Sequence, residues 1–217
     1  MLKDKDIREG LFDFLEDKYG KVRILEEKAM GRSRADIVMI TTTRICGIEI
    51  KSDADTYVRL SRQVKDYNRF FDINYVVVGS SHAVHISEHV PDFWGIITVD
   101  EVEGKPDYYE LRKPLVNPYM EPICKLTMMW RPELAHIQEI NEMPKYKEKS
   151  KAFVIEKILA KVPEDILNKQ LCDELFERDY ETIAEVINEY RKANKRGAKK
   201  TGKKAVKRAV RKVRKRI

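Results

Sequence analysis

The sequence predicts an α/β fold with a mixed sheet, followed by a helical extension. Two observations predict the α/β part: an amphipathic helix pattern opens the chain, and six short β-rich runs follow, interrupted by a second helix pattern. A third observation predicts the extension, because three prolines lie between residues 114 and 122 and every later pattern is helical. The 217 residues suffice for one sizeable domain with an appendage.

The first helix is expected over residues 4–19. Ile7, Leu11 and Leu15 recur at helical spacing and form its apolar stripe. Gly20 stands just past the end, where a glycine commonly terminates a helix.

Three strands are expected next, at residues 21–26, 35–40 and 45–50, from their alternating or β-branched residues. A basic loop, residues 31–34, separates the first two. Residues 41–44 separate the last two and are few enough for a hairpin, although they lack the Asn-Gly of a tight turn.

A long second helix is expected over residues 52–71, with Ser52 or Asp53 as its cap. The rest of the α/β part is expected as a strand at 73–78, a short helix at 83–89 and strands at 95–99 and 108–111. Beyond the prolines, helices are expected at 123–129, 132–140, 152–162, 165–178 and 182–193.

The charge is divided unevenly along the chain. The net charge is +7, but residues 191–217 carry 15 Lys and Arg and no acid, which leaves −8 for residues 1–190. We therefore expect three parts: an α/β domain over residues 1–112, a helical extension over 113–190 and a basic, flexible tail over 191–217.

The composition argues against several classes of protein. Three widely spaced cysteines do not fit a disulfide framework or a paired-cysteine zinc site. No run approaches the roughly 18 apolar residues of a membrane span, and no apolar stretch near the N-terminus resembles a secretory signal. We expect a cytoplasmic protein, with nucleoid association as an option and no membrane partner.

Asp36, Glu49 and Lys51 are the most informative residues. In a hairpin centred between Thr42 and Thr43, Asp36 lies opposite Glu49, and the Cβ atoms of such neighbours are about 4.5–5.5 Å apart. Glu49 and Lys51 are two residues apart on one strand and therefore share a face.

Two carboxylates this close repel each other unless a cation lies between them. Mg²⁺ takes oxygen ligands and keeps several waters, so that two carboxylates suffice to hold it. Such an ion polarises a phosphoryl oxygen and lowers the pKa of a bound water, while the Lys51 ammonium can orient the attacking hydroxide. The set suits phosphodiester hydrolysis.

The order Arg34-Ala-Asp36-Ile-Val, a hairpin and Glu49-Ile-Lys51-Ser resembles the signature of the PD-(D/E)xK nucleases, with Ala35 in place of the motif's proline. The longer pattern EIKSDADTYxRLxxQVxxYNRxFD is similar to a group of bacterial and phage-associated proteins and, more distantly, to MmcB-like DNA-repair proteins. The resemblance implies a restriction-endonuclease-like αβββαβ core, dependence on Mg²⁺ or Mn²⁺, and DNA as substrate.

The resemblance also implies further site residues. Gln63 stands on the helix where many members place a Gln or Tyr beside the scissile phosphate, and the Ile50 carbonyl is expected among the metal ligands. Glu9 corresponds to an N-terminal Glu that contacts the metal, with Glu26 and Glu16 as alternatives.

Basic residues flank the expected site. Arg32, Arg34, Arg59 and Arg62 either contact phosphates or form a solvated face. The tail is expected to bind nucleic acid through counterion release, the alternative being a solubilising role. The tail residues expected in contact are Lys203, Lys204, Lys207, Arg208 and Arg211.

The resulting hypothesis is a metal-dependent DNA nuclease, acting in repair, recombination or the processing of phage and mobile-element DNA. Two alternatives stay open on the same fold: a nucleic-acid-binding module without catalysis, and a module that interacts with host machinery. A homodimer is possible, because many nucleases of this kind cut two strands as dimers.

Deleting residues 191–217 is expected to flatten the salt dependence of DNA binding, because fewer counterions are then released. Fluorescence anisotropy at several NaCl concentrations measures the slope. An unchanged slope would refute the role of the tail.

Overall fold

The computed structural model describes residues 4–53, 55–146 and 148–178. The chain forms two compact units, residues 1–176 and 177–217, and all described helices and strands lie in the first. In chain order they are α1 (Asp4–Tyr19), β1 (Arg23–Met30), β2 (Ser33–Ile40), β3 (Ile45–Lys51), the 3₁₀ turn η1 (Tyr57–Arg59), α2 (Leu60–Phe70), β4 (Ile73–Gly79), α3 (Ser80–Ala83), the 3₁₀ turn η2 (Ile86–Glu88), β5 (Gly95–Val102), β6 (Lys105–Arg112), α4 (Pro122–Thr127), α5 (Arg131–Ile140), α6 (Lys151–Lys161) and α7 (Glu164–Phe176).

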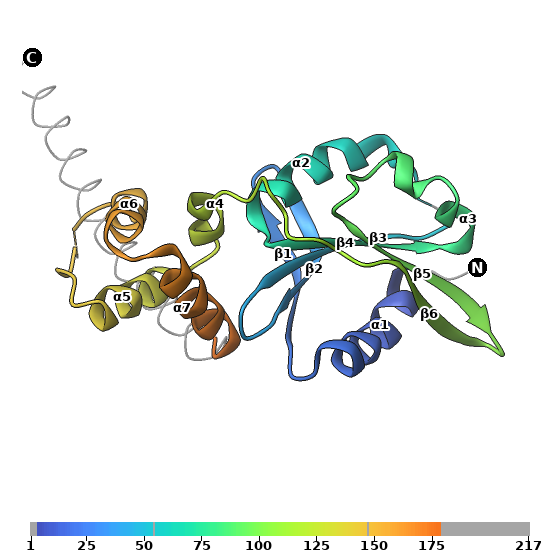
Figure 1. Ribbon diagram of the computed structural model, residues 1–217, viewed down its shortest axis with the longest axis horizontal. Helices are drawn as coiled ribbons and strands as arrows, with labels where there is room; N and C mark the ends of the chain where they lie inside the picture. Colours follow the sequence, from blue (N-terminus) through green and yellow to red (C-terminus); the bar gives the residue numbers. More distant parts are fainter. Residues whose placement is uncertain (1–3, 54, 147, 179–217) are drawn as a thin grey trace, which may run out of the picture. The chain divides into compact units, whose positions relative to one another are not determined.

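The first unit is a mixed α/β core with a helical extension, as the sequence predicts. Its six strands follow the order β1-β2-β3-β4-β5-β6, antiparallel at both ends and parallel from β3 to β5. The expected αβββαβ order is present from α1 to β4. Helices α1 and α2 cover opposite faces of the sheet (Figure 1).

The β2–β3 hairpin has the predicted register. Ile37 pairs with Ile48 and Ile40 with Ile45, which places Asp36 level with Glu49. Thr41 closes the turn in place of an Asn-Gly pair: its amide donates to the Arg44 carbonyl (2.9 Å) and its hydroxyl accepts from the Arg44 amide (3.0 Å).

Alternation along the strands divides the core between the two faces. Ile37 and Met39 of β2 pack with α1, whereas Val38 and Ile40 pack with α2. Gly47 of β3 lets α2 approach closely, because a Cβ there would lie 2.2 Å from the Phe71 ring.

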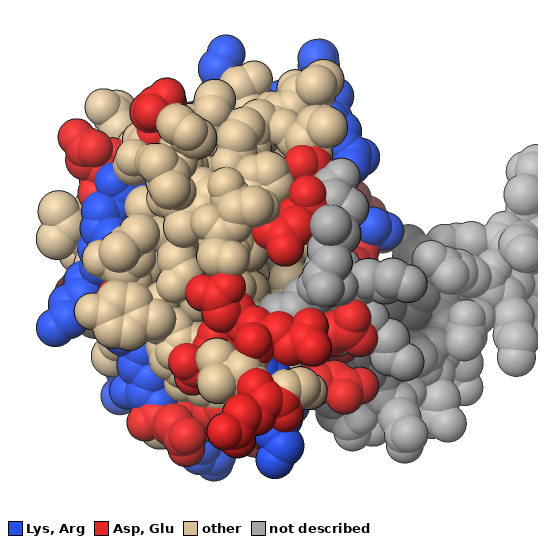
Figure 2. All heavy atoms as spheres, turned by 90° about the vertical axis from the view of Figure 1, so that its right-hand side faces the viewer, with Lys and Arg blue, Asp and Glu red and all other residues tan. Residues whose placement is uncertain are grey.

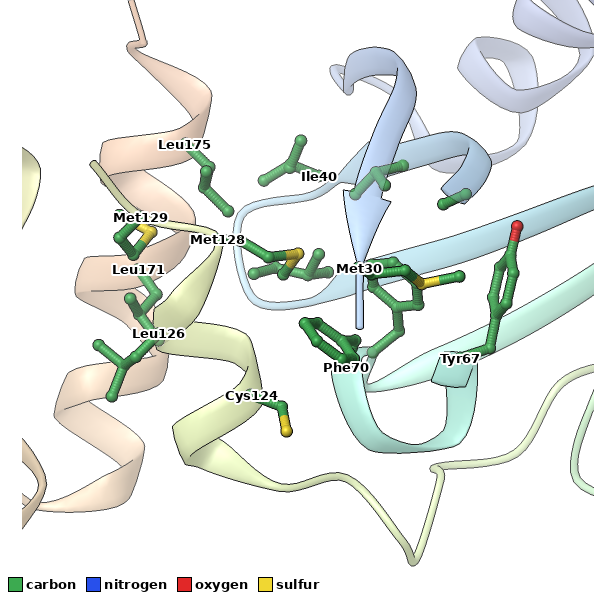
Figure 3. Packing of buried hydrophobic residues seen from close by; sticks show 14 of the residues in the cluster. Met30, Ile40, Tyr67, Phe70, Cys124, Leu126, Met128, Met129, Leu171 and Leu175 are labelled. Atoms are coloured by element: carbon green, nitrogen blue, oxygen red, sulfur yellow. The ribbon is translucent and has the colours of Figure 1, made fainter. Parts of the chain in front are cut away.

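The helical extension shares the core of the α2 face. Met128 and Leu175 of the extension lie together with Met30 and Ile40 of the sheet in one buried cluster (Figure 3). The extension therefore shares buried apolar contacts with the sheet instead of forming a separate core.

A buried ion pair ties the extension to the start of β4. Lys125 of α4 donates to both Asp72 carboxylate oxygens, at 2.6 and 2.7 Å, and Asp72 also accepts from the Ile45 amide at 2.7 Å. The Lys125 ammonium donates in addition to Asn168 of α7. One cation thus connects two helices of the extension to the sheet.

Several expected boundaries are wrong. In place of one short helix at 83–89 the chain forms α3 and the 3₁₀ turn η2, while β5 and β6 meet in a longer hairpin than the expected 95–99 and 108–111. Helix α2 begins at Leu60 and not at residue 52, because the Asp55 carboxylate accepts from both the amide and the hydroxyl of Ser52 (2.9 and 2.8 Å) and forms a turn first. Strand β1 does not end at residue 26 but continues to Met30.

The expected helix at 182–193 lies outside the described residues, and the expected division at residues 112 and 190 stays a prediction. Within the described ranges, no helix combines the length and the apolar character needed to cross a bilayer.

Replacing Lys125 by Met is expected to lower the free energy of unfolding by about 3–5 kcal/mol, because the buried Asp72 carboxylate loses its charged partner. Urea denaturation measures the change. Lys169→Met, an exposed change on α7, is the control; equal stability of the two variants would contradict the role of the ion pair.

Candidate functional site

Asp36 lies at a point of β2 where the backbone of the strand is hydrogen-bonded to neither β1 nor β3. The β1–β2 pairing passes from Ile37 to Ala35 without including Asp36, and the β2–β3 pairing stops at Ile37. The Asp36 backbone bonds to side chains instead: its amide to the Tyr67 hydroxyl (3.3 Å) and its carbonyl to Arg8 Nη1 (3.1 Å). Because these partners replace ladder bonds, the strands separate while the Asp36 backbone keeps its hydrogen bonds.

The Asp36 carboxylate replaces a backbone hydrogen bond between β2 and β3. Its Oδ2 accepts from the Ile50 amide of β3 at 2.9 Å, and its Oδ1 lies 3.8 Å from Arg8 Nη2. Burial, followed by repulsion from Glu49, raises the pKa of Asp36 to about 7. The charge of Glu49 therefore disfavours ionisation of Asp36, which is the condition under which a cation between the two acids is favoured.

Glu49 and Lys51 point from β3 toward α2, while Ile48 and Ile50 point to the α1 face, as predicted. The Glu49 carboxylate is 1% exposed and accepts from Lys51 Nζ at 2.5 Å. It also accepts from the side-chain amide of Gln63. A buried carboxylate with this many donors has a fixed position.

Tyr67 joins the site to the core. Its ring is fully buried, and its hydroxyl lies 2.8 Å from Glu49 Oε2 and 3.0 Å from the Ile48 carbonyl. Burial and the nearby Glu49 raise the pKa of Tyr67 well above its usual value. The hydroxyl therefore stays protonated at neutral pH and serves as a donor.

Asp36, Glu49, Lys51 and Gln63 line a cavity of about 500 Å³ in which basic groups outnumber acidic ones. Its basic residues are Arg8, Arg32, Arg34, Lys51, Arg59 and Arg62. Its acidic residues are Glu27, Asp36, Glu49 and Asp55. Such a lining suits a ligand that carries negative charge, such as a phosphate group.

Residues 1–210 match the family model described as bacteriophage P4 protein cII. The chain belongs to this family. A solved structure, SfsA of Pyrococcus furiosus in complex with Ca²⁺, is 18% identical with a TM-score of 0.32, and the match covers 48% of this chain and 61% of SfsA. No curated protein matches the chain.

In this member of the cII family, one pocket gathers nearly all the residues expected at the site. Asp36, Glu49, Ile50, Lys51 and Gln63 line it. The four expected arginines, Arg32, Arg34, Arg59 and Arg62, line it as well. The five expected tail residues lie outside the described part of the chain.

Glu9 is not at this pocket, which corrects the expectation for α1. It lies on another side of the molecule, around a hollow with Asp6 and Asp13. The face that bears α1 and the β5–β6 hairpin is rich in acidic side chains (Figure 2). Successive helical residues point about 100° apart, so that Arg8 faces the pocket and Glu9 does not.

The alternative carboxylates do not replace Glu9. Glu16 lies at a different hollow, and Glu26 accepts from Arg8 Nη1 at 3.2 Å without lining the pocket. Two further acids do line it, Glu27 and Asp55. Sequence reasoning missed Glu27 because the first strand was expected to end at residue 26. Had the first strand been extended beyond residue 26, its pairing with β2 would have placed Glu27 opposite Asp36 and marked it as a site residue.

The donor set fits a hard divalent cation held by two acids. No group of three or more His, Cys, Asp or Glu among the described residues is arranged to hold a metal. Asp36 and Glu49 supply carboxylate oxygens, and Gln63 adds a buried Oε1 that has no hydrogen-bond partner within the described structure. With the Ile50 carbonyl, this oxygen set fits Mg²⁺ or Mn²⁺, which retain several waters.

Asp36→Asn is expected to flatten the pH dependence of stability in EDTA. The folded pKa of Asp36, about 7, exceeds its unfolded value, so that its contribution is largest at low pH and is lost as the pH rises from about 4 to 7. The side-chain amide of the variant does not titrate and has no such loss. Between pH 5 and pH 8, the free energy of unfolding of the variant therefore rises relative to that of wild type by on the order of 2 kcal/mol.

Urea denaturation at both pH values measures this difference. Asp13→Asn, an exposed change on α1, is the control. Parallel pH profiles for wild type and Asp36→Asn would show that the Asp36 carboxyl titrates normally.

Proposed function

We propose that the protein is a DNA nuclease that depends on Mg²⁺ or Mn²⁺ and hydrolyses phosphodiester bonds. The observation that carries the proposal is the meeting of Asp36, Glu49 and Lys51 at one pocket whose other walls bear arginines. The order of these residues along an αβββαβ chain is that of the PD-(D/E)xK nucleases, and membership of a phage protein family is in keeping with DNA processing.

Asp36 and Glu49 would hold the metal, with the Ile50 carbonyl and Gln63 Oε1. A bound ion would polarise the phosphoryl oxygen and lower the pKa of a water. The protein fixes the geometry of its own ligands: the Ile50 amide orients Asp36, while Tyr67 and Gln63 donate to Glu49. These bonds leave the carboxylates little freedom to reorient before the reaction.

Lys51 supplies a positive charge in direct contact with Glu49. Its ammonium is 5% exposed and lies 2.5 Å from Glu49, so that it is desolvated and held in one direction. There it orients the attacking hydroxide and stabilises the charge that develops on the phosphate oxygens. No residue is required to form a covalent intermediate.

The arginines bind the substrate backbone. Arg59 and Arg62 are exposed residues of η1 and α2, and Arg32 lies in the β1–β2 turn, so that cations from three segments border the same cavity. Contacts of this kind hold the phosphates without reading sequence.

One observation favours a rival function, namely DNA binding without cleavage. The six basic residues at the pocket exceed its four acidic residues, and each of Asp36 and Glu49 already has a basic side chain beside it. Such a surface binds phosphate even if no metal enters. The rival keeps the fold and the arginines but predicts no cleavage.

Lys51→Met and Glu49→Gln are expected to lower the cleavage rate at least 100-fold with little loss of DNA affinity. Both residues act on the reacting phosphate, whereas the arginines bind the other phosphates of the DNA backbone. Plasmid, single-stranded and branched DNA are incubated with Mg²⁺, Mn²⁺ or EDTA. Lys105→Met on β6 is the control for lysine removal.

Melting temperatures show whether each variant is folded. Cleavage by wild type in Mn²⁺, its absence in EDTA and its loss in both site variants support the proposal. If wild type nicks none of these DNAs while all variants bind equally, the binding module is the correct function.

A further inference from the structure

Among the described residues, Glu27, Glu103 and Glu142 adopt left-handed backbone conformations, with φ of 54°, 52° and 51°. This region is unfavourable for residues with a Cβ. Glu103 precedes Gly104 in the tight β5–β6 turn and Glu142 follows the end of α5, where such angles are usual. Glu27 lies inside strand β1, so that neither a turn nor a helix end accounts for its conformation.

The conformation of Glu27 accompanies the opening of the sheet. Glu26 pairs with Ile37 and Lys28 with Ala35, but Glu27 is left out of the pairing directly across from Asp36. Its side chain lines the pocket. A departure from the ladder next to a functional site commonly redirects a side chain, and here the redirected group is a carboxylate.

Two guanidiniums meet this carboxylate. Glu27 Oε1 accepts from Arg8 Nη2 at 2.8 Å, and Glu27 Oε2 pairs with Arg34 Nε. Arg8 is 13% exposed and also lies 3.8 Å from Asp36, whereas Arg34 is 65% exposed. Glu27 thus holds a largely buried arginine and an exposed arginine on one side of the pocket.

The ion pair between Glu27 and Arg8 affects the charge around Asp36. Arg8 lies between Glu27 and Asp36, and opposite charges at 3–4 Å attract strongly away from water. Arg8 Nη1 donates to Glu26 and to the Asp36 carbonyl, so that Glu27 is the acid that draws Nη2 away from the Asp36 carboxylate. Without Glu27, Nη2 would move toward Asp36 and neutralise an acid that the metal needs. Arg34 would lose its ion pair and gain rotational freedom, which weakens its grip on a phosphate.

We propose that Glu27 is a positioning residue of the site, which orients Arg8 and Arg34 toward the DNA phosphate and keeps Arg8 from closing on Asp36. The inference rests on the proposed function, since it assigns the two guanidiniums to a phosphodiester substrate. It also replaces the N-terminal acid expected on α1 with an arginine–glutamate pair shared between α1 and β1.

The first experiment compares Glu27→Gly with Glu103→Gly and Glu142→Gly. Glycine adopts positive φ readily, so that each control is expected to raise the melting temperature by about 2–4 °C and to leave cleavage unchanged. Glu27→Gly, which loses ion pairs but relieves the same backbone conformation, is expected to keep its melting temperature within about 3 °C.

Single-turnover cleavage by Glu27→Gly is expected to fall at least tenfold, while its DNA affinity in EDTA is not weakened, because a negative charge has been removed. The cleavage rate of Glu27→Gln, which keeps the side-chain shape but not its charge, is expected to fall by a similar factor. A merely structural role would lower stability and binding together. Cleavage equal to that of the two controls overturns the inference.

A second experiment needs no cleavage. The loss of DNA affinity caused by Arg34→Gln is measured in EDTA, in wild type and in Glu27→Gly. If Glu27 orients Arg34, the loss is expected to be about fivefold in wild type and below twofold in Glu27→Gly. Equal losses in the two backgrounds overturn the inference whether or not DNA is cut, whereas an inactive wild type with unequal losses rejects only the nuclease function.

Discussion

The hydrogen bonds of the Asp36 backbone are the interaction on which the pocket depends. Its carbonyl is bonded to Arg8 of α1 and its amide to Tyr67 of α2, two helices on opposite faces of the sheet. A strand inside a sheet separates from its neighbours only where its backbone groups find other partners. The cavity therefore forms only when both helices are docked, which makes the site a property of the whole α/β core.

The same arrangement concentrates charge where the core would otherwise be apolar. Glu49 and Lys51 are almost fully buried, and isolated charges in such a place are strongly disfavoured. Each is stabilised by the other, and Glu49 also accepts from Tyr67 and Gln63. The acid pair is nevertheless incompletely compensated, since Glu49 still raises the pKa of Asp36. A divalent cation would remove this remaining repulsion.

Tyr67 links the packing of the core to the geometry of the site. Its ring lies 5.3 Å, centroid to centroid, from those of Phe71 and Trp94, while its hydroxyl contacts Glu49. The cluster that contains this ring continues into α4 and α7 of the extension (Figure 3). Together with the Lys125–Asp72 ion pair, this continuity joins the extension to the core that supports the site.

The sequence by itself determined the mixed α/β class, the β2–β3 register and the meeting of Asp36, Glu49 and Lys51. These follow from rules of short range: strand residues alternate between faces, and a four-residue connection fixes which residues face each other. Ile48 and Ile50 pack against α1 for the same reason.

Only the tertiary structure decided which residue α1 contributes and how β1 ends. Arg8 rather than Glu9 reaches the pocket because the docking of α1 sets the rotation of the helix, and neighbouring residues differ by about 100°. Glu27 joins the site through a left-handed backbone that no propensity favours. Both outcomes depend on contacts between elements distant in the chain, and a local sequence pattern contains no information about those contacts.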